Sequence, residues 1–144
     1  MRIGPNTLYI TAALLIFGCT RAPSTRLDNV ALARSEAAVR MLVTGEARLC
    51  SPDHARFKLM GAEKLLVFGC VDTEKPQGRQ GRHLNWGTIF DLPSMSIEMA
   101  TFDSPMGGTA ENQINHRLAM PMADREQRAT VFRTWFASKE AARQ

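Results

Sequence analysis

The sequence lacks the motifs by which catalytic sites are commonly recognised. It contains no G-x-S-x-G nucleophile elbow, no H-E-x-x-H helix and no P-loop. Its three histidines, His54, His83 and His116, lie far apart, so none forms a close ligand pair with another. The only glycine pair, Gly107-Gly108, has no flanking lysine to bind phosphate. We therefore predict that the chain is not an enzyme and that it carries no cofactor.

The sequence also has little excess charge and no block of charge of one sign. The formal net charge is +4 over 144 residues, and the basic residues are spread along the whole chain. This distribution argues against a nucleic-acid-binding protein and weakly favours an anionic neighbour, such as phospholipid headgroups or cell-wall polymer. A content of 44% hydrophobic and 22% charged residues is that of a globular protein, and the length allows one domain.

No apolar run is long enough to span a bilayer as a helix. The longest lies at the N-terminus, where Arg2 supplies a positive charge and residues 8–18 are apolar. A run of this length falls within the ~7–15 residues of a signal-peptide core and below the ~20 residues of a membrane-spanning helix. A buried strand of a cytosolic fold is the alternative, but the lack of polar alternation favours export. We predict a signal peptide and no transmembrane helix in the mature chain.

The residues at the end of this run resemble the lipobox of bacterial lipoproteins. Ile16 fills the aliphatic position, Gly18 the small position before cleavage and Cys19 the lipid-acceptor position. Phe17 departs from the pattern, which usually has a small residue there. The resemblance covers the first 19 residues and implies a signal peptide at residues 1–18. It also implies a diacylglycerol on the cysteine and further acylation of the new amine, which together give nearly permanent anchoring.

The residues that follow the acceptor bear on the location of the protein. Thr20, rather than aspartate, stands after the acceptor, which by the sorting rule of such lipoproteins implies the periplasmic face of the outer membrane. An inner-membrane lipoprotein and a soluble periplasmic protein stay open as alternatives. Ordinary secretion would need cleavage after Ala22, at a poor site. Residues 19–26 then hold the acceptor cysteine and a short polar tether, and residues 27–144 form a single domain.

If Cys19 carries lipid, Cys50 and Cys70 remain as an even pair in an oxidising compartment. We predict a disulfide between them, which would close a loop of about 20 residues and contribute about 3 kcal/mol. Two reduced thiols are the alternative. These two cysteines could instead form a four-ligand zinc site with His54 and His83. The spacing between Cys70 and His83 is long, however, and exported thiols tend to oxidise, so we predict no metal.

Hydrophobic periodicity predicts a helix at each end of the domain. From Asp28, apolar residues recur every three or four positions as far as Leu42, and Gly45 is a plausible stop. Asp124 begins the second helix, and Gln127 completes a capping-box pattern. The apolar stripe of this second helix consists of Val131, Phe132, Trp135 and Phe136.

Between the helices, the pattern predicts a small antiparallel sheet of three to four strands. Residues 65–71 are the most apolar part of the mature chain and predict a central strand, with residues 56–60 as a candidate partner. Residues 84–91 and 94–102 predict a hairpin, and residues 103–113 a loop. In its second strand, Met95, Ile97 and Met99 alternate with Ser94, Ser96 and Glu98. The fold class is therefore α+β, with the C-terminal amphipathic helix packed on the sheet.

Two surfaces are candidates for binding. Lys75, Arg79 and Arg82 stand in a glycine-containing loop and could meet phosphate or carboxylate groups. Trp135 and Phe136 are expected in the core, but they could instead form a membrane-binding or partner-binding face.

The function expected from the sequence is therefore a lipid-anchored, non-enzymatic module of an envelope assembly that serves secretion, conjugation or the cell wall. Its partners would be the membrane and an envelope protein. The alternative is a ligand-binding or inhibitory lipoprotein that acts on anionic cell-wall polymer or lipopolysaccharide.

Overall fold

The computed structural model describes residues 25–43, 47–73, 82–104, 106 and 108–144. The predicted signal peptide, the lipobox with Cys19, and the loop residues Lys75 and Arg79 lie outside the described residues. Within them the elements are α2 (Arg26–Leu42), β1 (Ala47–Leu49), the short 3-10 helix η1 (Pro52–His54), β2 (Arg56–Met60), β3 (Lys64–Thr73), β4 (Arg82–Asp91), β5 (Ser96–Phe102), α3 (Ala110–Leu118) and α4 (Met122–Ala142). The fold class is α+β, as predicted.

The described strands form one antiparallel sheet of five strands, which is more than the three or four predicted. The order is β1-β3-β4-β5, and β2 also pairs with β3. Strand β1 pairs with the C-terminal part of β3 and β2 with its N-terminal part, so β1 and β2 follow one another along the same side of β3. The additional strand β1 has only three residues, too few for an alternating pattern to be recognised in the sequence.

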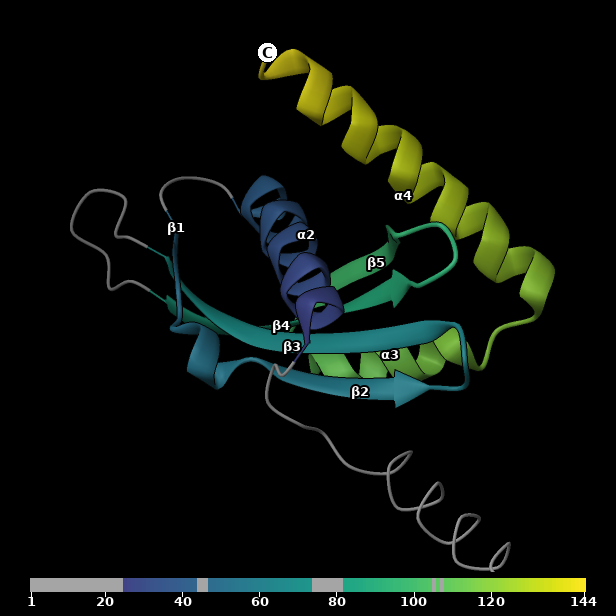
Figure 1. Ribbon diagram of the computed structural model, residues 1–144, viewed down its shortest axis with the longest axis horizontal. Helices are drawn as coiled ribbons and strands as arrows, with labels where there is room; N and C mark the ends of the chain where they lie inside the picture. The colour runs from purple at the N-terminus through teal and green to yellow at the C-terminus, as the bar shows by residue number, and fades with distance from the viewer. Residues whose placement is uncertain (1–24, 44–46, 74–81, 105, 107) are drawn as a thin grey trace, which may run out of the picture.

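Helices cover both faces of this sheet, because the strands alternate their apolar side chains between the faces. Figure 1 shows α2 on one face and α3 on the other. Val67 of β3 belongs to the larger apolar core, which includes Ala31 and Val39 of α2. Leu66, the preceding residue, belongs to a smaller core with Ile114 of α3. This alternation places the two clusters on opposite sides of the central strands.

Three details at the helix starts differ from the sequence prediction. Thr25, not Asp28, is the N-cap of α2. The Asp28 carboxylate accepts a hydrogen bond from the backbone N–H of Thr25, which completes a capping box. Helix α3 lies partly where a loop was predicted, because it is short and buries only Ala110 and Ile114, too little for a clear helical period. Helix α4 begins at Met122, directly after Pro121, rather than at Asp124.

Helix α4 packs along the edge strand β5, and its C-terminal part extends away from the sheet (Figure 1). The predicted apolar stripe is therefore only partly buried. Phe132 and Phe136 pack against the larger core, but Ala129 is the one fully buried residue of this helix. Val131 remains 66% exposed.

A charged network is buried where β5 bulges. The register of β4 and β5 shifts between Ile89 and Phe90. Glu98 is therefore the extra residue of a β-bulge and is paired with no residue of β4. Glu98 is 1% exposed and forms ion pairs with Lys64 at 3.0 Å and with Arg125 at 3.3 Å. Lys64 also pairs with Asp91 at 2.6 Å. The alternation predicted for this strand places Glu98 on the face opposite Ile97, and the structure keeps that arrangement. Ile97 lies in the larger core, and Glu98 is buried on the other face beside Lys64, because both faces of the sheet are covered.

The stability of the fold should depend on pH through Asp91. Burial tends to raise the pKa of this carboxyl, but hydrogen bonds from Lys64 and Ser94 outweigh burial and lower it to about 2. A carboxyl with a lowered pKa stabilises the fold above its unfolded value, and this contribution is lost as the pH falls towards 2. Between about pH 5 and about pH 2, the wild type should lose about 2 kcal/mol more stability than the Asp91→Asn variant.

Urea unfolding at a series of pH values measures this difference. The matched control is Asp53→Asn, which changes an exposed carboxyl of η1 and should lose stability in acid as the wild type does. Equal acid sensitivity of Asp91→Asn and the wild type would show that Asp91 does not contribute.

Candidate functional site

One end of the sheet face that carries α3 is polar and hollowed. Along β3, Leu66 and Phe68 lie in the small core with α3, whereas Cys70 and Asp72 line a hollow of about 920 Å³. We call this hollow the polar hollow. Its floor and walls include Arg48, Cys50, Cys70, Asp72, His83 and Asn85, with His54, Arg56 and the first turn of α3 at its margin.

Strand register brings these residues together in two rows across the sheet. In the first row Arg48 of β1, Asp72 of β3 and His83 of β4 are directly opposed. In the second row Cys50 and Cys70 are joined, and Cys70 is opposed to Asn85. Opposed residues of antiparallel strands place their side chains within contact distance on one face. The polar hollow is therefore assembled by pairing of segments that are far apart in the sequence.

The predicted disulfide between Cys50 and Cys70 is present. The backbone N–H of Cys50 donates to the carbonyl of Cys70 at 3.1 Å, and the two Cα atoms are 5.4 Å apart. The bond thus ties the segment between β1 and η1 to the middle of β3.

The neighbouring Gly69 admits a close approach of Trp86 on β4. A Cβ atom at Gly69 would lie 2.4 Å from Cζ2 of the indole, which is shorter than any real contact. The strand segment that holds Cys70 therefore needs glycine before the cysteine, and Trp86, 2% exposed, fixes that segment from the other face.

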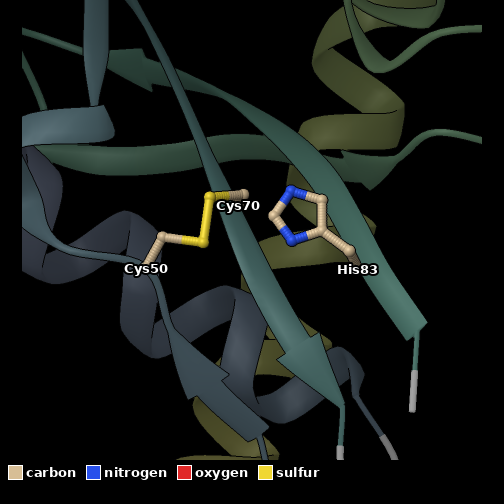
Figure 2. A group of neighbouring side chains, drawn as sticks. All are labelled: Cys50, Cys70 and His83. Atoms are coloured by element: carbon tan, nitrogen blue, oxygen red, sulfur yellow. A yellow bond between two sulfur atoms is a disulfide. The ribbon is translucent and has the colours of Figure 1, made fainter. Parts of the chain in front are cut away.

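His83 contacts Asp72 and lies beside the disulfide. Its Nδ1 atom is 2.7 Å from Oδ1 of Asp72, and both side chains are more than half exposed. Figure 2 shows the imidazole of His83 beside Cys70, next to the disulfide. A ring nitrogen of His83 and both sulfur atoms lie within 4.8 Å of one another. His54, the other histidine of the zinc site considered from the sequence, lines the polar hollow but is not part of this group.

Other polar groups of the hollow are engaged in holding its shape. Asn85 donates to Asp103 at 3.0 Å, and Asp103 accepts from the backbone N–H of Ala110 at 2.6 Å. Asp103 thereby links β4 to the N-terminus of α3. Arg56 donates to the carbonyl oxygen atoms of residues 53 and 55, at 2.7 and 2.8 Å. These bonds hold β4, the start of α3 and the segment before β2 in place around the hollow.

The other predicted site residues lie elsewhere. Arg82 is exposed at the start of β4, next to His83. Trp135 lies on α4, in a groove of about 590 Å³ that also contains Leu42, Val131 and Phe132. Phe136 lies beyond this groove and packs against the larger core. The structure thus brings Cys50 and Cys70 together with His83, and it keeps the aromatic residues of α4 apart from them.

Comparison with protein families, curated proteins and solved structures yields no match. Among the described residues, no helix has the length and apolar character needed to cross a membrane. The function is therefore proposed from the residues of the chain itself.

Proposed function

We propose that this chain is a lipid-anchored protein of the bacterial envelope, acylated at Cys19 and held at the periplasmic face of the outer membrane. In this proposal it catalyses no reaction and acts as an interaction module of an envelope assembly. The disulfide between Cys50 and Cys70 supports an exported protein, since such bonds persist in oxidising compartments. Export is also what the apolar run at residues 8–18 favours.

The apolar groove of α4 is the surface through which we propose that the module binds its protein partner. The exposed apolar surface of α4 supports binding of a protein partner. Val131 is 66% exposed beside Phe132 and Trp135, whose rings are 5.8 Å apart. Aromatic residues at a partly exposed groove are the residue types that contribute most to protein interfaces. Arg117 and Arg128 line the same groove and would supply its polar rim.

A second candidate function is binding of an anionic ligand, such as cell-wall polymer or lipopolysaccharide, with an inhibitory or recognition role. Lys75, Arg79 and Arg82 favour it, since residues 74–81 join the strand ends that carry Asp72 and His83. Arg48 lies in the first row of the polar hollow, and it would add a cation beside those strand ends.

Site-specific photo-crosslinking in cells, combined with labelling by a palmitate analogue, tests these proposals. A photo-reactive residue at position 131 should give one discrete cross-linked protein product. The same residue at position 140, exposed on the opposite side of α4, should give none. The Cys19→Ser variant should lose the label and most of the cross-linked product.

Each outcome separates the parts of the proposal. No label on the wild type would refute the lipid anchor. Equal products from positions 131 and 140 would refute α4 as the binding face. Co-purification of polysaccharide or lipopolysaccharide without a protein product would favour the second candidate instead.

A further inference from the structure

The disulfide and His83 together have the composition of a metal site whose ligands are masked by oxidation. Two sulfur atoms and one imidazole nitrogen lie within 4.8 Å of one another on one side of the sheet. We propose that reduction of the Cys50–Cys70 bond converts this group into a binding site for a thiophilic closed-shell cation, Zn²⁺ or Cu⁺. Two thiolates and an imidazole are the ligands that these cations prefer. The proposal needs neither the lipid anchor nor the docking surface on α4.

The backbone already provides the spacing that such a site requires. In a tetrahedral zinc site with bonds of about 2.3 Å to sulfur and about 2.0 Å to nitrogen, neighbouring ligand atoms lie about 3.5–4 Å apart. Cys50, directly after β1, lies beside Cys70 of β3, with Cα atoms 5.4 Å apart. Because both side chains are on the same face, rotation about their Cα–Cβ bonds can separate the released sulfur atoms to that distance. No movement of the strands is needed.

Asp72 prepares His83 for the role of a ligand. With Nδ1 donating to Oδ1 of Asp72 at 2.7 Å, the neutral imidazole keeps a free lone pair on Nε2. A carboxylate that holds the other ring nitrogen is the usual outer partner of a metal-bound histidine, since it fixes the tautomer and makes the ligand more basic. The three protein ligands leave a fourth position open toward the polar hollow, where a water molecule or an external ligand can bind.

The conversion balances with a dithiol as the reductant. The dithiol gives two electrons and two protons to the Cys50–Cys70 bond, becomes a disulfide itself and leaves two thiols on the chain. Binding of Zn²⁺ then displaces the two thiol protons, and two sulfur–zinc bonds form. The oxidised chain lacks thiolates, so the site exists only in the reduced protein. Metal binding is thereby coupled to the redox state of the compartment.

Zinc titration of the oxidised and reduced protein tests this inference. The full chain carrying Cys19→Ser is used, so that Cys50 and Cys70 are its only thiols. After anaerobic reduction and removal of the reductant, Zn²⁺ is titrated against a chromogenic chelator. The reduced protein should bind one Zn²⁺ per chain, and the oxidised protein should bind it at least about 100-fold more weakly.

Three variants locate the site. His83→Ala should weaken zinc binding by at least about tenfold, and Asp72→Asn by about 10- to 100-fold. His54→Ala is the matched control, because His54 lines the same hollow outside the ligand group, and it should leave affinity unchanged.

Equal affinity of the oxidised and reduced protein would overturn the inference, and so would normal binding by His83→Ala. If reduction alone unfolds the chain, Zn²⁺ should restore the near-ultraviolet circular dichroism of the buried Trp86. Failure to restore it would likewise refute the site.

Discussion

Replacing Glu98 with alanine should destabilise the fold by about 3 kcal/mol. The side chain is 2% exposed and lies between Lys64 and Arg125, whose own side chains are 21% and 14% exposed. Removal of the carboxylate leaves Arg125 without this counter-ion in a setting where water replaces it poorly. Lys64 keeps its pair with Asp91, so the loss should fall short of the cost of an isolated buried charge. Urea unfolding gives the difference in free energy.

Glu126→Ala is the matched control for this prediction. Glu126 pairs with Arg133 at 3.1 Å, but its side chain is 68% exposed, so we expect a loss below about 1 kcal/mol. A comparable effect of the two substitutions would show that burial of Glu98 does not determine its contribution. Glu98→Gln, which keeps the shape and removes the charge, should fall between the two.

Removing the disulfide by the double substitution Cys50→Ala, Cys70→Ala should lower the free energy of unfolding by about 3 kcal/mol. The bond joins residues 20 positions apart, and without it the unfolded chain gains the entropy of an open loop. The dependence of stability on urea should steepen at the same time, because the unfolded chain then exposes more surface. Both quantities come from one unfolding curve.

Reduction of the wild type in the absence of metal is the control for this variant. It breaks the same covalent link without changing the side-chain carbon atoms, so its loss should match that of the double variant. A loss below about 1 kcal/mol in both would mean that the β1–β3 pairing is maintained without the bond.

The sequence predicted those parts of the fold that have a long, regular pattern. The helix after Asp28 and the hairpin of residues 84–102 follow clear periods of burial, and the structure confirms both. The three-residue β1 and the short α3 bury too few side chains to show a period, so tertiary pairing determines them. Glu98 illustrates a further limit: an alternating pattern predicts a side chain that faces solvent, but here both faces of the sheet are covered, so the carboxylate is buried beside Lys64 and Arg125.

Of the candidate site, only the disulfide could be predicted from the sequence, because it followed from the number of cysteines. The pairing of Cys50 with Cys70 followed from an even number of cysteines once Cys19 is set aside. The contact of His83 with Asp72 depends instead on the register of β3 against β4. Residues 74–81 separate these strands, and a connection of that length does not specify register as a two-residue turn does. The group that includes His83 therefore emerges only in the folded chain.

The edges of the sheet affect how readily neighbouring copies of the chain could aggregate through their strands. On one side of the sheet, α4 covers β5. On the other side, Cys50 and the short helix η1 separate β1 from β2. An uninterrupted free strand would offer a template on which neighbouring copies could extend the sheet into fibres. Here each outer strand is either shielded or broken into short pieces. A population of such chains concentrated on a surface would thus be protected from strand-to-strand aggregation by its own architecture.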